Sequence, residues 1–302
     1  MSRFNTLQAT YGHFEHLVFE QLDNGMILAK INNALATATV SLYGGQIIEW
    51  QPKNQAAPVL WRSSRAQFIP GKAIRAGVPL CWPWFGAHPT DSNATKHGFA
   101  RISPWEITSV LTTISGATEI LMTMQETQAS RLNQDVWARL ELRLIIGEAL
   151  SIDLTTINLS EQTLTFTEGL HAYLHVSDIA SVQVNGLNGC QYVDSARGNV
   201  RKQQSGSVRF SDEVDQVYLN TTATCVLEDP GLTRKVTISK SGSHSTVVWN
   251  PWLALATKMD DLGPQGWQTM VCVESMNALD NVVTLGAGMS HTLHATYSVE
   301  RL

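Results

Sequence analysis

The chain has 302 residues, of which 43% are hydrophobic and 16% are charged, a composition typical of a globular protein. Its formal net charge is −5 at pH 7 and it contains no basic run, so a nucleic-acid-binding surface is not expected. A small anionic substrate would therefore need a local cluster of cations.

Targeting signals and membrane spans are not expected. The first eight residues lack the basic region and apolar run of a signal peptide, and no apolar run reaches the roughly 20 residues of a membrane-spanning helix. The four cysteines form no Cys-x-x-Cys pair: Cys81, Cys190, Cys225 and Cys272. This spacing argues against a zinc knuckle or a redox dithiol, and we expect Cys81 and Cys272 to be buried free thiols. A soluble, cytoplasmic protein is predicted.

The residue pattern predicts strands along most of the chain. Residues 1–25 are expected to form a short helix or an extended arm. Runs rich in β-branched and aromatic residues, many of them alternating with polar residues, then predict strands at residues 26–32, 36–42, 46–50, 59–61, 105–110, 118–124, 138–146, 149–158, 164–176, 182–184, 208–210, 225–227, 235–238, 246–249, 269–274 and 291–299. Amphipathic helices are scarce, and there is no linker or internal repeat. We therefore expect one all-β domain over residues 1–302, built as a large sandwich.

Residues 75–101 combine cations and aromatic residues in a stretch bent by prolines. Pro79 and Pro83 remove backbone donors and fix φ, so an ordinary central strand is not expected here. Arg75 and Arg101 border the segment, and their forked guanidinium groups suit a carboxylate or a phosphate. Three aromatic side chains offer apolar faces that suit the C–H face of a sugar ring: Trp82, Trp84 and Phe85. The alternative is that the aromatic side chains lie in the core and the arginines form surface pairs.

Two other candidate residues lie in strands. Alternation in residues 164–176 places His171, Tyr173 and His175 on one face, which indicates either a polar cleft or a solvated face. Glu274 follows four apolar residues, and a carboxylate that closes a buried strand must be hydrogen-bonded, paired or raised in pKa. The alternative for Glu274 is that the strand has simply reached water.

These stretches together resemble a known family. Arg75-Ala-Gly-Val-Pro-Leu, Trp-Pro-Trp-Phe-Gly86 and His97-Gly-Phe-Ala-Arg101 resemble the aldose 1-epimerase (mutarotase) superfamily, and more narrowly its hexose-6-phosphate mutarotase (glucose-6-phosphate 1-epimerase) branch. Further matching stretches are Gly169-Leu-His171-Ala-Tyr-Leu, Val247-Val-Trp-Asn250-Pro-Trp252 and Val271-Cys-Val-Glu274. The resemblance runs from Gly44 to near the C-terminus, and it implies an antiparallel β-sandwich of galactose mutarotase type.

The resemblance implies that Glu274 is the general base and His171 the general acid of mutarotation. Opening a sugar ring requires removal of the C1 hydroxyl proton and donation of a proton to the ring oxygen, after which the C1–C2 bond rotates and the steps reverse. A Glu raised toward neutrality is a better base, and a His protonated at cytoplasmic pH is a suitable acid. Such a reaction requires no metal, nucleotide or other cofactor.

The same resemblance implies substrate-binding residues. His97 would hold the ring or its hydroxyls, and Asp215 would contact hydroxyls. Arg75 and Arg101 match positions that bind substrate in the hexose-6-phosphate branch, and forked cations suit a phosphate dianion. Lys96 stands where some relatives have glutamine, so it either strengthens phosphate binding or has a changed role. The predicted function is interconversion of the anomers of a hexose 6-phosphate, with glucose 6-phosphate expected.

Two stretches are expected to have structural roles. Trp249-Asn250-Pro-Trp252 is expected to pack the wall of the cleft, with Asn250 hydrogen-bonding near the site. Asp260 and Asp261 precede Leu-Gly-Pro and most simply form a solvated turn.

Two other functions stay open at this stage. An aldose 1-epimerase for unphosphorylated sugars would not need the cation cluster, and a non-catalytic sugar-phosphate binding protein would not need both His171 and Glu274. The expected partner is a small-molecule sugar phosphate, with no nucleic acid and no membrane. A monomer is expected, although neither the oligomeric state nor the preferred hexose follows from the sequence.

Overall fold

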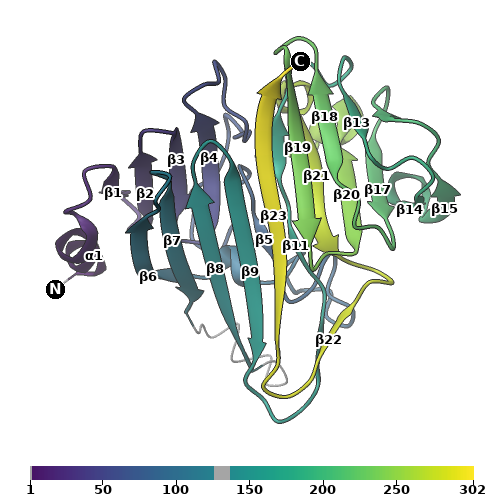
Figure 1. Ribbon diagram of the computed structural model, residues 1–302. Helices are drawn as coiled ribbons and strands as arrows, with labels where there is room; N and C mark the ends of the chain where they lie inside the picture. The colour runs from purple at the N-terminus through teal and green to yellow at the C-terminus, as the bar shows by residue number, and fades with distance from the viewer. Residues whose placement is uncertain (1, 126–136) are drawn as a thin grey trace.

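The computed structural model describes residues 2–125 and 137–302, and it confirms the predicted all-β fold (Figure 1). The strands that pair in its sheets run antiparallel. The helical segments are short: α1 (Arg3–Tyr11), α3 (Trp252–Ala256) and the 3₁₀ turns η1 (Ala100–Ile102), η2 (Ser195–Arg197) and η3 (Gly266–Gln268). None of the described helices combines the length and the apolar character needed to cross a membrane.

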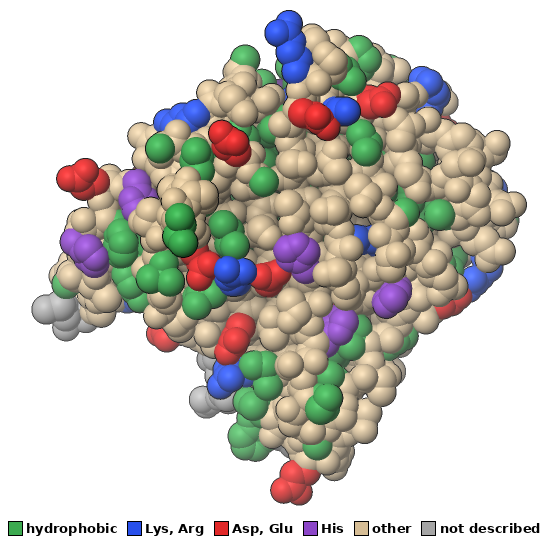
Figure 2. All heavy atoms as spheres, in the orientation of Figure 1, with side chains coloured by type: hydrophobic (Ala, Val, Ile, Leu, Met, Phe, Trp, Pro, Cys, Tyr) green, Lys and Arg blue, Asp and Glu red, His purple; other side chains and the backbone are tan. Residues whose placement is uncertain are grey.

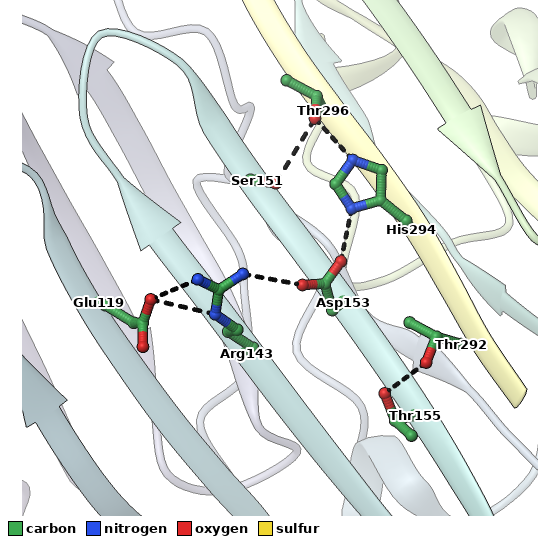
Figure 3. Close-up of polar contacts among 8 residues, drawn as sticks. All are labelled: Glu119, Arg143, Ser151, Asp153, Thr155, Thr292, His294 and Thr296. Atoms are coloured by element: carbon green, nitrogen blue, oxygen red, sulfur yellow. Dashed lines mark hydrogen bonds and ion pairs between the residues drawn. The ribbon is translucent and has the colours of Figure 1, made fainter. Parts of the chain in front are cut away.

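The first large sheet has nine strands and a polar outer face. Its strands in spatial order are β16 (Val208–Arg209), β13 (Gln183–Asn185), β18 (Cys225–Asp229), β19 (Arg234–Ser241), β23 (Ser290–Arg301), β9 (Leu150–Asn158), β8 (Ala138–Ile146), β7 (Thr118–Met124) and β6 (Trp105–Thr112). Acidic and basic side chains are interspersed on the face of the molecule in Figure 2. Cross-strand contacts on this sheet join Glu119, Arg143, Asp153 and His294 (Figure 3). Exposed ion pairs of this kind contribute only about 0.2–1 kcal/mol each, so the network fits a sheet-stabilising role.

The second large sheet carries the candidate site. Its strands are β15 (Val200–Gln203), β14 (Gln191–Asp194), β17 (Val214–Tyr218), β20 (Ser245–Asn250), β21 (Met270–Asn277), β11 (Glu168–Leu170) and β5 (Leu80–Cys81), with β12 (Tyr173–His175) also paired to β21. A four-stranded sheet contains β1 (Leu17–Gln21), β2 (Ile27–Asn32), β3 (Ala36–Ser41) and β4 (Gln46–Pro52), and a two-stranded sheet contains β10 (Leu164–Phe166) and β22 (Val283–Leu285). In Figure 1 the four-stranded sheet (purple) and the green strands of the second large sheet lie on opposite sides of β23 (yellow).

One hydrophobic core joins the three larger sheets. It includes Trp50 of β4, Leu154 of β9 and Val273 of β21, all of which are buried. The indole N–H of Trp50 donates to the carbonyl of Gly147 at 3.1 Å, which ties the four-stranded sheet to the nine-stranded one. Because this core covers one face of the second large sheet, the other face is left to form the site.

The N-terminal region and several short strands differ from the predictions. The expected N-terminal helix is α1, but β1 lies within the expected arm and pairs with β2. Residues 59–61 form no strand, since only an isolated bridge at Leu60 is present. Strands β14, β15 and β17 lie where no strand was predicted, and the four residues of β15 are all exposed, so they carry no alternating pattern.

The long strand predicted over residues 164–176 is divided into β10, β11 and β12. The breaks arise because the backbone N–H groups of Thr167 and His171 donate to the carbonyls of Pro83 (3.1 Å) and Pro79 (3.0 Å). The proline-bent segment therefore runs beside this chain. Its strand β5 lies at the edge of the sheet, where proline neighbours are tolerated.

Candidate active site

The central feature of the site is a histidine that lies opposite a glutamate. In the pairing of β11 with β21, Leu170 is opposite Ser275, and the same register continues into β12, so His171 lies opposite Glu274. Directly opposed residues share a face, and Nδ1 of His171 is 3.4 Å from Oε1 of Glu274. Only 10% of the His171 side chain and 1% of the Glu274 side chain are exposed. Glu274 has therefore not simply reached water, and His171 does not lie on a solvated face.

His97 is held close to this pair by a tightly turned loop. Its φ is +63°, and the next residue, Gly98, packs so closely on the carbonyl of Trp82 that a Cβ would lie 1.9 Å from it. The N–H of Gly86 donates to Nδ1 of His97 at 3.3 Å, so the ring proton is on Nε2. The ring centroid is 5.6 Å from that of His171. Burial, together with the charge of nearby Arg101, lowers the pKa of His97 to about 3, so its ring is a neutral hydrogen-bonding group.

Tyr173 supports the ring of His171 and is itself held by an arginine. The two rings stack with centroids 4.9 Å apart and an interplanar angle of 15°. Nη1 of Arg75 donates to the hydroxyl of Tyr173 at 2.9 Å, and Nε of Arg75 is 2.7 Å from Oδ1 of Asp261. The expectation that Asp261 lies in a merely solvated turn is therefore wrong, because it forms a half-buried ion pair with Arg75.

A row of four side chains crosses the same face of the sheet. Tyr173 lies opposite Cys272, Cys272 opposite Trp249, and Trp249 opposite Asp215. Because neighbouring strands are about 4.8 Å apart, Asp215 is on the far side of this face from His171. Trp249 packs edge-on against His171, with ring centroids 6.2 Å apart.

Two cations lie beside the site, and neither is paired with a carboxylate in the part of the chain that the structure describes. Lys96 is exposed and Arg101 is half-buried, and Nη2 of Arg101 donates to the carbonyl of Lys96 at 2.6 Å. Among residues 2–125 and 137–302, no carboxylate forms an ion pair with either side chain. Burial raises the pKa of Asp215 to about 6, and the charge of Lys96 opposes that rise, so these cations act on the site electrostatically.

Burial moves the two central residues toward their neutral forms. It raises the pKa of Glu274 well above the ordinary value, an effect to which Asp215 adds and which Arg101 opposes. It lowers the pKa of His171 well below the ordinary value, and the nearby groups of His97 and Arg101 add to that effect. In the free site, the proton that the pair shares is therefore favoured on Glu274 rather than on His171. Each of the two groups favours its uncharged form because a buried ion without a bonded partner is costly.

The aromatic residues of the proline-bent segment lie in different environments. Trp82 is 1% exposed and belongs to the main core, so it does not offer a face to a sugar. Trp84 and Phe85 are half-buried, and the Phe85 ring packs edge-on against His97 at 5.0 Å. The reading of these residues as core is correct for Trp82 alone.

Two residues expected near the site have other roles. Nδ2 of Asn250 donates to the carbonyls of Trp267 and Met270, both at 2.8 Å, so Asn250 fixes the backbone. His175 lines a separate groove of about 790 Å³ that also contains Trp61 and Arg62. That groove includes neither member of the central pair.

Cys272 is the residue at the site that the sequence reasoning assigned only to the core. It is a free, buried thiol, as predicted for it and for Cys81. Its position two residues before Glu274 in β21 puts both side chains on one face. That alternation was the signal by which its place at the site could have been found.

Comparison with known proteins identifies the family of this chain. Residues 28–298 match the family model described as Aldose 1-epimerase. The chain belongs to the aldose 1-epimerase family. A relative from Salmonella typhimurium, which carries the provisional name glucose-6-phosphate 1-epimerase, is 33% identical over 264 residues, or 85% of each chain. A relative from Cenchrus ciliaris with the same provisional name is 32% identical over 83% of this chain and 78% of its own.

Solved structures of the family share the fold. The crystal structure of a provisionally named mutarotase from Salmonella typhimurium has a TM-score of 0.89 and 30% identity, covering 96% of this chain and 95% of that one. A galactose mutarotase-like protein from Clostridium acetobutylicum has a TM-score of 0.69 at 14% identity, over 95% of this chain and 98% of that chain, which speaks for the fold alone. The family resemblance, the galactose mutarotase type of β-sandwich and the assignment to an isomerase family are thus confirmed.

Proposed function

We propose that this epimerase interconverts the α and β anomers of a hexose 6-phosphate, with glucose 6-phosphate as the expected substrate. The observation that carries this proposal is the buried pair of His171 and Glu274, 3.4 Å apart, beside the cations of Lys96 and Arg101. Mutarotation needs an acid–base pair such as His171 and Glu274, and binding of a phosphate needs cations such as Lys96 and Arg101. The provisional names of the relatives from Salmonella typhimurium and Cenchrus ciliaris support the phosphosugar.

In the proposed reaction, the proton of the neutral pair first moves from Glu274 to His171; the Glu274 carboxylate then removes the C1 hydroxyl proton while the His171 imidazolium gives a proton to the ring oxygen. The bond between C1 and the ring oxygen breaks, and an open-chain aldehyde results. The C1–C2 bond rotates, and the two groups return the protons so that the ring closes on the other face of the aldehyde. At the open-chain stage Glu274 is protonated and His171 is neutral. These are the same uncharged forms that burial favours in the free site.

Two further side chains are proposed to orient the sugar. His97, with its proton on Nε2, donates a hydrogen bond to a ring or hydroxyl oxygen. Asp215, on the far side of the sheet face, accepts hydrogen bonds from hydroxyl groups. Because the pKa of Asp215 is about 6, it is an acceptor on both oxygens near neutral pH.

The phosphate is assigned to Lys96 and Arg101, with Arg75 in a supporting role. Arg75 contributes its charge, but its Nε and Nη1 groups already contact Asp261 and Tyr173. Lys96 and Arg101 have no such carboxylate among the described residues. Charge-assisted hydrogen bonds from such donors are the strong ones for a phosphate.

The test is the rate of anomer exchange, measured by NMR exchange spectroscopy on α-glucose 6-phosphate and on α-glucose with and without the protein. Acceleration of the phosphorylated sugar alone is the expected result. Equal acceleration of free glucose would identify a general aldose 1-epimerase. Unchanged rates with measurable binding of glucose 6-phosphate would identify a non-catalytic binding protein.

Three properties accompany this proposal. Residues 1–302 are proposed to form one domain, supported by a main core that draws on all three larger sheets. The protein is proposed to be a monomer in the cytoplasm. Light scattering during size-exclusion chromatography measures the oligomeric state, and a mass of two chains would contradict a monomer.

A further inference from the structure

Three metal-ligating side chains meet at the catalytic pair. His171, Cys272 and Glu274 are all buried, and one donor atom from each lies within 4.8 Å of the other two. The cluster follows from the sheet: Cys272 and Glu274 are two residues apart on one face of β21, and His171 lies opposite Glu274.

The donor set fits zinc. An imidazole nitrogen, a thiolate sulfur and a carboxylate oxygen are the three protein donors that Zn²⁺ accepts, with bonds of about 2.0–2.3 Å. A tetrahedral zinc ion with such bonds holds its nitrogen and oxygen donors about 3.4 Å apart. The His171 and Glu274 atoms are 3.4 Å apart already, so two of the three donors stand at the required spacing.

A second observation points to a ligand at the same place. Nδ1 of His171 and Oε2 of Glu274 are buried, and neither has a hydrogen-bond partner among the described residues. Buried polar atoms are normally satisfied. Among the described residues, these two atoms are therefore left without a protein partner.

We propose that Zn²⁺ binds to His171, Cys272 and Glu274 and inhibits the enzyme by occupying both proton-transfer groups. Binding replaces the thiol proton of Cys272, and any proton on Glu274, with the metal; these protons leave to solvent and no electron is transferred. The resulting zinc–thiolate–carboxylate complex is neutral, which suits a buried position beside Arg75 and Arg101. The metal is an inhibitor here, and the proposed reaction does not use it. Inhibition rests on the proposed function, whereas binding does not.

The first test measures binding with Co²⁺ as a spectroscopic probe for the zinc site. Full-length protein stripped with a chelator is titrated with Co²⁺, and the thiolate-to-cobalt charge-transfer band in the near ultraviolet is recorded. The wild type and Cys225→Ser, a buried thiol in β18 outside the cluster, are expected to give the band at one equivalent and to lose it on addition of Zn²⁺. Cys272→Ser and Cys272→Ala are expected to give no band. A wild type without the band, or a Cys272→Ser protein that keeps it, would overturn the site.

The second test measures inhibition as a fraction of each variant's own exchange rate with glucose 6-phosphate. Removal of the soft thiolate donor is expected to raise the Zn²⁺ concentration for half-inhibition at least tenfold in Cys272→Ser relative to Cys225→Ser. Equal sensitivity of the two variants would overturn the inhibition. A charge-transfer band in the wild type without any exchange activity would support the metal site and contradict the proposed function. Exchange activity without a band would support the proposed function and contradict the metal site.

Discussion

Two glutamate–histidine pairs lie on opposite faces of the same sheet. Glu274 and His171 face the site, whereas Glu168 lies opposite Asn277, three residues further along and so on the core face, where it meets His291 of β23. Both glutamates are buried, at 2% and 0% exposed. The two pairs have the same residue types and similar burial, so a comparison between them shows the effect of the neighbouring residues.

The core pair is bonded, and the site pair is not. Oε1 of Glu168 is 3.0 Å from Nε2 of His291 and accepts from Nδ2 of Asn277 at 3.1 Å. The bond to Glu168 raises the pKa of His291. Because His291 belongs to the nine-stranded sheet and Glu168 to the other large sheet, this pair ties the two layers together.

At the site, the pKa of the histidine shifts in the opposite direction. The pKa of His171 is lowered by burial and by nearby His97, Arg101 and Arg75, and its contact with Glu274 is not a hydrogen bond. The core pair is thus held by its contacts and ties the sheets together. The site pair lacks such contacts among the described residues, which leaves both groups available to a substrate.

Replacing His171 by Asn should produce the largest effect. Asn keeps a polar group in the buried site but cannot carry the proton, so the exchange rate of glucose 6-phosphate should fall about 10²–10⁴-fold. The melting temperature should change little. NMR exchange spectroscopy and a thermal melt measure the two quantities, and an Asn variant with a wild-type rate would remove His171 from the mechanism.

Replacing His291 by Gln should reverse that pattern. The buried Glu168 loses its bonded partner, which should lower the free energy of unfolding by about 2–3 kcal/mol. The exchange rate per folded molecule should stay at the wild-type value, since His291 faces away from the site. Chemical denaturation gives the free energy, and an unchanged midpoint would show that the pair does not tie the sheets.

The pH dependence of stability sharpens the comparison. The pKa values of His291 and Glu168 are both raised in the folded protein. A histidine with a raised folded pKa stabilises the fold fully below its unfolded value of about 6.5, and this contribution is lost as the pH rises through the folded pKa. The raised pKa of Glu168 has the same sign.

The wild type should therefore lose stability, relative to the double variant Glu168→Gln/His291→Gln, as the pH rises above about 6.5. Urea denaturation across this range measures the difference, and the double variant serves as the control because it carries neither titrating group. A difference that grows in favour of the wild type with rising pH would contradict the bonded pair.

Replacing Lys96 by Ala should have the smallest effect. Lys96 is exposed, so loss of its charge should raise the KM for glucose 6-phosphate only about two- to fivefold. The kcat should be unchanged, since Lys96 lies outside the proton-transfer pair. Lys235→Ala, which removes a half-buried lysine of the nine-stranded sheet that pairs with Glu300, is the control for loss of a positive charge away from the site. A Lys96 variant with a wild-type KM would assign the phosphate to Arg101 and Arg75.

The local pattern of the sequence predicted the all-β fold and singled out His171, Tyr173 and Glu274, whereas the places of His97, Lys96 and Asp215 came from the family resemblance. Neither source gave the contacts between these residues. Alternation placed His171 and Tyr173 on one face and Glu274 at the end of a buried run. It could not predict that His171 lies opposite Glu274, because β12 and β21 are far apart in the chain and their register is a tertiary property.

The misplaced residues have the same explanation. Asp261 reads locally as part of a solvated turn, and only folding brings it to Arg75. The sequence around Trp82 suggests an aromatic face for a sugar ring. Only the pairing of β5 with β11 places this side chain in the core. The break in residues 164–176 depends on carbonyls of Pro79 and Pro83, which the pattern of that strand does not contain.

The most direct test of the account compares Glu274→Gln with Glu168→Gln in one assay, the NMR exchange rate of α-glucose 6-phosphate per folded molecule. Both variants remove a buried carboxylate from the same sheet and keep its shape. Glu274→Gln should lose at least about 10²-fold in rate, and Glu168→Gln should keep the wild-type rate. Equal rates in the two variants would contradict the assignment of proton transfer to the pair that faces the site.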